Sequence, residues 1–258
     1  MNYSLRAYGV GEQNLPGWCC LFGANDTSLY RIVFYVWIAQ AGNKTVVIDS
    51  GLPPHQDDFR TLADACGQLD ARCALQHSRT LDEVFELAGL APDAVDILLL
   101  TQPITYHSGG LLPQYFPRAD VYLARAGLME FLLDNPGHPP RDCYFTGKTW
   151  AYLHRLAIEG RLYLPDTRTE VLEDLFIEPT GGHHPGSAAV TLRTVRGVVG
   201  ILETAFVEAN IAREQPVGLA EDAAHCRRVI RHYKRFCDPL LAIHDSSIPE
   251  RFPGGVIA

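Results

Sequence analysis

The alternation of apolar and polar positions along the chain predicts strands first and helices between them. Residues 31–40 are β-branched and aromatic, and residues 44–49 (KTVVID) follow a turn at Asn43, so the two segments predict a hairpin. Residues 96–101 (DILLLT) form an unbroken apolar run, which is typical of a strand covered on both faces. Further strands are expected at residues 120–123, 170–177, 188–193, 198–202 and 239–243.

Helix signals lie between these strands. Thr80 and Glu83 have capping-box spacing and Gly89 follows, which predicts a helix over residues 81–88. Other helices are expected at residues 55–66, 125–133, 148–159 and 219–236. Residues 11–30 mix Gly, Pro, Asn and aromatic residues without periodicity, and we expect a loop near a binding face. Because strands and helices alternate and no linker divides the chain, we expect one α/β domain over residues 1–258.

Composition limits the partners that the protein can have. The chain has 258 residues, of which 47% are apolar, and its formal net charge of -8 argues against nucleic acid as a partner. The N-terminus lacks the apolar core of a signal peptide, and the longest apolar stretch (residues 32–39) is too short to cross a membrane. We therefore expect no membrane partner. Seven cysteines, an odd number without a secreted-type framework, predict free thiols in a cytoplasmic protein, and the lack of C-x-x-C spacing argues against a thiolate zinc site.

Polar residues that can do chemistry stand next to the predicted buried strands. Asp49, Glu203 and His244 each follow a strand directly, and His107 lies in the loop after residues 96–101. His183 lies in a loop just before another strand. Since ligands of open α/β sheets bind at the carboxyl ends of strands, these side chains are expected to converge on one edge.

The residues around these positions resemble a known family. The segment TQPITYHSGGL (residues 101–111) resembles the T-H-x-H-x-D-H-x-G-G-L loop of metallo-β-lactamase-fold hydrolases. The segments VVIDSG (46–51), GGHHPGS (181–187), ILETA (201–205) and AIHDSSIP (242–249) are similar to its other motifs, in the family's order. The layout is most similar to the lactonase-like branch. The resemblance implies a four-layer αβ/βα sandwich and a small-molecule substrate. The helix expected at residues 148–159 is then a helical insertion in this sandwich.

The chain departs from the family's metal-binding pattern. Gln102 and Ile104 stand where the family has the histidines of H-x-H, and Tyr106 stands where it has the aspartate. Ile104 has no ligand atom and Gln102 offers only a weakly binding carbonyl, so a dinuclear centre is not expected. One divalent ion, zinc or iron, remains chemically feasible on the ligands that the resemblance implies: His107, His183, Glu203 and His244.

Three functions fit this set of residues. The first is a metal-dependent hydrolase of an ester, lactone or thioester, with Glu203 at the metal and Tyr106 donating a hydrogen bond to an oxyanion. The second is a mononuclear iron enzyme of oxygen or redox chemistry on the same ligands. The third is a metal-free ligand-binding or regulatory protein, motivated by the missing histidines, in which Glu203 pairs with a cation or a histidine.

Several features near the expected site keep more than one interpretation. Asp49 is expected to bond loop amides, and Gly109 and Gly110 to permit tight turns. His184 is either a neighbour of the ligand histidine or, if the motif is shifted, the ligand itself. The aromatic residues between 144 and 152 suit a pocket wall, a homodimer contact or core, and the helix expected at residues 148–159 suits a lid.

Overall fold

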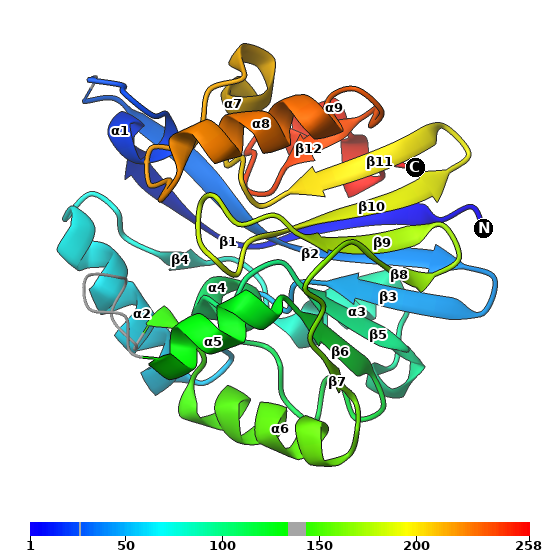
Figure 1. Ribbon diagram of the computed structural model, residues 1–258. Coiled ribbons are helices and arrows are strands. Elements are labelled where there is room, and N and C mark those ends of the chain that lie inside the picture. The colour runs from blue at the N-terminus through cyan, green and yellow to red at the C-terminus, as the bar shows by residue number, and fades with distance from the viewer. Residues whose placement is uncertain (26, 134–142) are drawn as a thin grey trace.

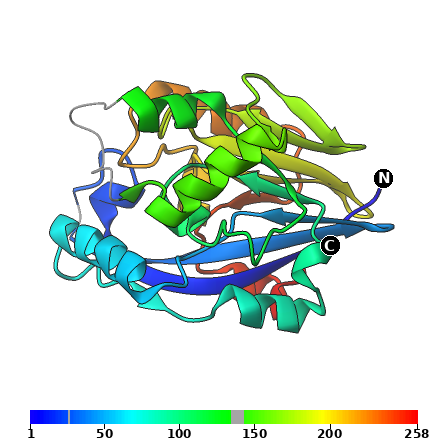
Figure 2. The same cartoon turned by 90° about the horizontal axis from the view of Figure 1, so that it is seen from below.

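The computed structural model describes residues 1–25, 27–133 and 143–258, which form two β-sheets with helices on their outer sides. The larger sheet has the strand order β4-β1-β2-β3-β5-β6-β7, and the smaller has β12-β11-β10-β9-β8. In Figure 1, α7 and α8 lie beside the smaller sheet, while α2, α3, α5 and α6 lie around the larger one, and Figure 2 shows the same arrangement from below. The predicted four-layer αβ/βα sandwich is confirmed.

The strands follow the chain from one sheet to the other. The larger sheet contains β1 (Ser4–Pro16), β2 (Leu29–Ala41), β3 (Lys44–Ile48), β4 (Gln76–His77), β5 (Ile97–Leu100), β6 (Asp120–Leu123) and β7 (Leu162–Tyr163). The smaller sheet contains β8 (Thr169–Leu172), β9 (Leu175–Pro179), β10 (Ala188–Thr194), β11 (Gly197–Leu202) and β12 (Leu240–Ala242). β3 and β5 are parallel neighbours, and so are β11 and β12, so each pair ends at the same edge of its sheet.

The helices occupy the connections. They are α1 (Gly17–Cys20), α2 (Gln56–Leu69), α3 (Leu81–Ala88), α4 (Thr105–Ser108), α5 (Arg125–Leu133), α6 (Gly147–Ile158), α7 (Glu208–Arg213), α8 (Ala223–Tyr233) and α9 (Ile248–Arg251). The predicted capping box is present at α3, where the Thr80 amide donates to Glu83 at 2.7 Å and the Glu83 amide donates to Thr80 Oγ1 at 3.2 Å. Gly89 ends this helix with φ 66°, a conformation that favours glycine.

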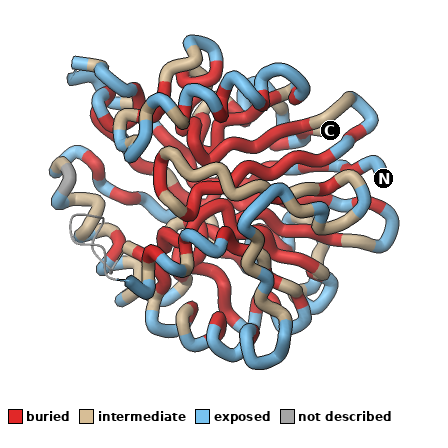
Figure 3. Tube along the Cα trace, viewed as in Figure 1, coloured by how far each residue is buried: buried red, intermediate tan, exposed pale blue. Residues whose placement is uncertain are grey.

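Two buried apolar clusters hold the layers of the fold together. Because successive side chains of a strand point to opposite faces of the sheet, neighbouring residues belong to different clusters. Ile201 and Val190 join the main cluster with β2, β3 and β5, whereas their neighbours Leu202 and Ala189 pack with α8 residues such as Ile230. The second cluster therefore lies between the smaller sheet and α8, whereas the first fills the space between the sheets and also includes buried residues of α3 and α6 beside the larger sheet. Figure 3 shows the buried residues along the centre of the molecule.

The structure corrects three sequence-based expectations. Residues 11–30 are not simply a loop, because β1 extends to Pro16 and pairs with β2 along most of its length. A β-bulge between Gly9 and Gly11 shifts its burial pattern, which hides the period of two. Residues 170–177 form two strands around a turn at Asp174, whose φ is 64°. The helix expected at residues 219–236 is the shorter α8, whose amide at His225 is capped by Asp222 at 2.8 Å.

Helix α6 matches the helix expected at residues 148–159, and it packs through Tyr152, Leu153 and Leu156. The Tyr152 hydroxyl donates to the Phe116 carbonyl at 2.6 Å, which ties α6 to the rest of the fold. Residues 134–142, which belong to the Pro- and aromatic-rich region around this helix, lie outside the described residues. Within the described ranges, none of the helices combines the length and the apolar character needed to span a membrane.

Candidate functional site

The site lies where four strands end, as the sequence predicts. Asp49 follows β3, Gln102 lies two residues after β5, Glu203 follows β11 and His244 lies two residues after β12. His107 lies in α4, just beyond β5. The parallel pairs β3–β5 and β11–β12 bring their carboxyl ends together, so both sheets contribute to the same buried cluster.

Asp49 orients His107. Asp49 has φ 57°, an unusual conformation for a residue with a side chain. Its carboxylate accepts a hydrogen bond from the Thr101 amide at 2.8 Å and lies 2.7 Å from His107 Nδ1. Because a carboxylate only accepts, His107 carries its proton on Nδ1 and leaves the Nε2 lone pair facing the other way. Asp49 thus bonds one loop amide, as expected, and also fixes an imidazole.

Close backbone packing holds helix α4 in place. The amide and hydroxyl of Ser50 donate to the His107 carbonyl at 2.7 and 3.0 Å. A Cβ on Gly110 would lie 2.2 Å from the Ser50 carbonyl oxygen, and one on Gly109 would lie 2.5 Å from the Pro53 nitrogen. Gly109 has an ordinary φ of −63°. These two glycines lie in the turn that follows α4, as expected, and they are needed there because the chains approach closely.

The Gln102 amide nitrogen lies between two of the predicted metal ligands. It is 2.9 Å from His107 Nε2 and donates to Glu203 Oε1 at 2.6 Å. His183 Nδ1 lies 2.7 Å from the same carboxylate oxygen. All four side chains are buried. In the described part of the structure, Gln102 Oε1 and Glu203 Oε2 have no hydrogen-bond partner.

The Glu203 carboxylate is ionised although it is buried. Burial raises the pKa of such a carboxyl, but the charge and hydrogen bond of His183 outweigh this effect and lower the pKa of Glu203 to about 2. Burial lowers the pKa of His183 itself. The adjacent Glu203 acts in the opposite direction on His183, and the His183 Nδ1 proton lies toward the Glu203 carboxylate at 2.7 Å. The cluster therefore contains two buried acidic side chains, Asp49 and Glu203, each hydrogen-bonded to a histidine.

His244 also presents a lone pair inside the cluster. Its Nδ1 lies 3.2 Å from the Val33 carbonyl oxygen, so Nδ1 is the donor and Nε2 carries the lone pair. Burial lowers its pKa well below the usual value, which keeps the ring neutral. Nε2 is buried and has no hydrogen-bond partner among the described residues. The rings of His107 and His244 lie 5.0 Å apart between centroids.

Tyr106 packs against both of these histidines. Its ring centroid lies 4.9 Å from that of His107 and 5.8 Å from that of His244, and Phe34 covers it at 4.7 Å. Burial raises the pKa of Tyr106 well above its ordinary value, so the phenol stays protonated. It can therefore donate a hydrogen bond to a group in the cavity.

The predicted ligand atoms have the right chemistry for a divalent cation, although they do not surround a single point. In the described part of the chain, one group of three or more His, Cys, Asp or Glu residues has its ligand atoms within 4.8 Å of one another, and it is Glu130, His184 and Glu221. The four predicted ligands form no such group, and the Gln102 amide lies between His107 and Glu203. Two buried acceptors without a donor, His244 Nε2 and Glu203 Oε2, nevertheless fit the ligand chemistry of a divalent ion.

A cavity of about 550 Å³ opens beside the cluster. His183, His184, His244 and Tyr106 line it together with apolar side chains from several elements, including Leu15, Ile32, Leu62, Ile104, Phe206 and Leu219. A largely apolar cavity with a few convergent polar groups is typical of a small-molecule site. Its lining contains no described residue of α6, so the structure gives no support for that helix as a lid.

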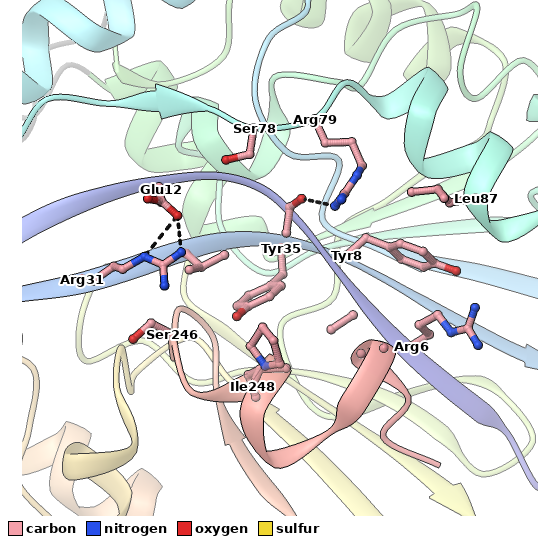
Figure 4. Close-up of a pocket in the computed structure, with 16 residues that line it drawn as sticks. Arg6, Tyr8, Glu12, Arg31, Tyr35, Ser78, Arg79, Leu87, Ser246 and Ile248 are labelled. Carbon is pink, nitrogen blue, oxygen red and sulfur yellow. Dashed lines mark hydrogen bonds and ion pairs between the residues drawn. The ribbon is translucent and has the colours of Figure 1, made fainter.

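A second cavity, of about 450 Å³, lies on the other face of β2 (Figure 4). Arg31, Val33 and Tyr35 line it, whereas Ile32 between them lines the first cavity. Its polar groups hold the fold together. Arg31 pairs with Glu12, and the Tyr35 hydroxyl donates to the Asp245 carbonyl at 2.9 Å. The first cavity, which contains the histidines, is therefore the candidate functional site.

Comparison with known proteins identifies the fold. Neither a family model nor a curated relative matches the sequence. An N-acyl homoserine lactone hydrolase with N-hexanoyl-L-homoserine at its catalytic metal center has a TM-score of 0.75 and 14% identity, covering 98% of this chain and 99% of that one. A hydrolase of the beta lactamase superfamily has a TM-score of 0.66 and 16% identity, covering 99% and 89%. The chain has the metallo-β-lactamase fold.

A third structure with this metallo-β-lactamase fold is a dizinc quorum-quenching lactonase in complex with N-hexanoyl-L-homoserine. Its TM-score is 0.66 at 13% identity, covering 98% of this chain and 89% of that one. These matches confirm the lactonase-like layout that the motifs indicated. At such low identity they describe the fold, and the chemistry must be argued from the side chains.

The sequence missed some residues of this region. Glu130 lies in the segment RAGLMEFLL, and a single acidic residue in an apolar helix is the signal that could have marked it. Glu221 precedes α8 and carries no local signal. The bridging position of Gln102 was also missed, because its sequence position indicates only that a histidine is lacking. His184 was left open as a neighbour or a ligand, and it lies beside His183 with ring centroids 4.2 Å apart.

Proposed function

We propose that this protein is a metal-dependent hydrolase that acts on a small ester, lactone or thioester in the 550 Å³ cavity. One observation carries the proposal. His107 and His244 both have their Nδ1 protons engaged, by Asp49 and by the Val33 carbonyl, so both present Nε2 lone pairs near an ionised Glu203. A histidine oriented in this way by a carboxylate or a carbonyl is the usual arrangement around a bound metal.

The proposed ligands of a single zinc or iron ion are His107, Glu203 and His244, with His183 beside them. A divalent cation held there supplies a Lewis acid for a carbonyl group and lowers the pKa of a water molecule toward neutrality. Gln102 must move its amide group out of the space between His107 and Glu203.

The other residues of the cavity would position the substrate and stabilise charge. The protonated Tyr106 lines the cavity and is proposed to donate a hydrogen bond to the oxyanion that forms when the acyl carbonyl is attacked. Ile104, Phe206 and Leu219 offer an apolar surface to an acyl group. The product N-hexanoyl-L-homoserine, which is bound in two structural neighbours, supports an acyl compound as the substrate class.

Elemental analysis and hydrolysis assays test the proposal together. Protein purified without added metal should contain, or take up, zinc or iron, and it should hydrolyse a panel of acyl lactones and aryl esters. His107→Ala and His244→Ala should lose both the metal at this site and the activity. His232→Ala, on the exposed side of α8, is the matched control and should lose neither. A folded wild type that cannot be loaded with either metal would refute the proposal.

A second candidate function is a metal-free ligand-binding protein, and the Gln102 amide favours it. The amide nitrogen donates hydrogen bonds to His107 Nε2 and to Glu203 Oε1, so these two acceptors have a partner without any ion. Gln102→Ala separates the two functions. If a metal is held here, removing the amide should leave or strengthen zinc binding. In a metal-free protein, the same change should only destabilise the fold, because it leaves the Glu203 carboxylate with one donor fewer.

A further inference from the structure

We propose that Glu130, His184 and Glu221 form a separate divalent-cation site at the wall of the cavity. One ligand atom from each residue lies within 4.8 Å of the other two. The three residues come from α5, from the loop between β9 and β10, and from the segment before α8. None of them belongs to the ligand set of the proposed function, so the two proposals can fail independently.

The backbone brings the three residues together through tight contacts. Helix α5 reaches the β9–β10 loop because Gly127 and Gly186 have no side chains, and a Cβ on Gly127 would lie 2.9 Å from the Gly186 Cα. The His184 amide donates to Ser187 Oγ at 3.0 Å, which fixes the loop. The Asp222 amide donates to the Gly182 carbonyl at 2.9 Å, which holds the chain next to Glu221 against the same loop.

The His184 ring gives an independent reason to expect a ligand. The residue is only 7% exposed, and its Nδ1 has no hydrogen-bond partner among the described atoms. The Glu130 Oε1 atom lies 3.6 Å from His184 Nδ1, beyond hydrogen-bonding distance. A buried nitrogen without a partner, facing two carboxylates, is costly unless an ion or a proton occupies the space. His184 and Glu221 also line the cavity.

The donors and their surroundings match known metal chemistry. Two carboxylates and one imidazole suit Mn²⁺, Fe²⁺ or Zn²⁺ and leave coordination positions open toward the cavity. The Tyr144 hydroxyl donates to Glu130 Oε1 at 2.6 Å, as an outer hydrogen bond to a metal-binding carboxylate would. Without a cation, the alternative is a proton on His184. Burial lowers the pKa of His184, but Glu130 and Glu203 outweigh burial and raise it overall.

Titration of the metal-free protein with Mn²⁺, followed by electron paramagnetic resonance, tests this site. Wild type should bind Mn²⁺, and Glu221→Gln should weaken that binding more than about tenfold, since even outer-shell changes cost about 10–100-fold. Glu221 is exposed, so its substitution should not disturb folding. Glu130→Gln should act in the same way. Glu250→Gln, an exposed carboxylate elsewhere, is the control and should bind as wild type does.

The same titration distinguishes this site from that of the proposed function. His244→Ala should leave the Mn²⁺ binding that Glu221→Gln removes. If Glu221→Gln and Glu130→Gln both bind Mn²⁺ like wild type, the cation site is refuted and the three residues are a proton-linked ion cluster. Wild type that binds no Mn²⁺ at pH 7.5 and no Zn²⁺ in a parallel calorimetric titration refutes it equally.

Discussion

Replacing Asp49 by asparagine should reverse the tautomer of His107. In the wild type, the Asp49 carboxylate accepts a hydrogen bond from His107 Nδ1 at 2.7 Å, and His107 Nε2 faces the Gln102 amide nitrogen at 2.9 Å. The introduced amide keeps the size of the side chain, and its oxygen can still accept from the Thr101 amide. Its nitrogen then faces Nδ1, which must become an acceptor. The proton moves to Nε2, where it meets the Gln102 N–H group.

The size of the effect follows from these contacts. Two donors that face each other leave one buried N–H without an acceptor, which costs about 1–3 kcal/mol of the free energy of unfolding. Loss of the carboxylate behind a metal-binding histidine lowers metal affinity by about 10–100-fold. Asp49→Ala is more severe for the fold, because it leaves the Thr101 amide without its acceptor, at about 1–3 kcal/mol, and leaves His107 Nδ1 only Thr101 Oγ1 at 3.1 Å.

Three measurements check this prediction. Urea denaturation of the metal-free protein gives the free energy of unfolding, competition with a chromophoric chelator gives the zinc affinity, and ¹⁵N spectra of the imidazoles give the tautomer. Asp96→Asn is the matched control, because Asp96 bonds Lys44 and the Thr45 amide at 2.8 and 2.9 Å at the opposite end of β5. It should lose stability without any change in zinc affinity. If Asp49→Asn kept wild-type zinc affinity with the proton still on Nδ1, the proposed orientation of His107 would be wrong.

Other consequences can be measured in parallel. Tyr106→Phe should lower kcat by about 10-fold or more with little change in stability, since it removes a proposed oxyanion donor; unchanged kcat would limit Tyr106 to packing. Trp37→Ala should cost about 3–5 kcal/mol in urea denaturation, because this side chain is fully buried between strands; a loss below about 1 kcal/mol would contradict the packing. Metal-free protein should lose thermal stability as the pH falls below the ordinary histidine value of 6.5. Burial lowers the pKa of His183 and His244, so the unfolded chain takes up protons that the folded chain does not. A flat Tm between pH 7 and 5 would contradict those shifts.

Local sequence signals identified most of the elements. The capping box at Thr80, the apolar run of β5 and the hairpin at Asn43 each depend on a few neighbouring residues, and each was found. The failures occurred where distant contacts decide the outcome. The bulge between Gly9 and Gly11 is a property of the pairing of β1 with β2. The residues next to these glycines do not indicate which strand pairs with them or in which register.

The order of the motifs by itself determined the fold, and it determined that the polar side chains near residues 49, 107, 203 and 244 share one edge, since strand ends converge in such a sandwich. Only the tertiary structure decided what those side chains do to one another. The Gln102 amide between His107 and Glu203, and the meeting of Glu130 with His184, join positions far apart in the sequence. Hydrogen bonds act over about 3 Å, so packing of the whole chain decides which donors and acceptors meet.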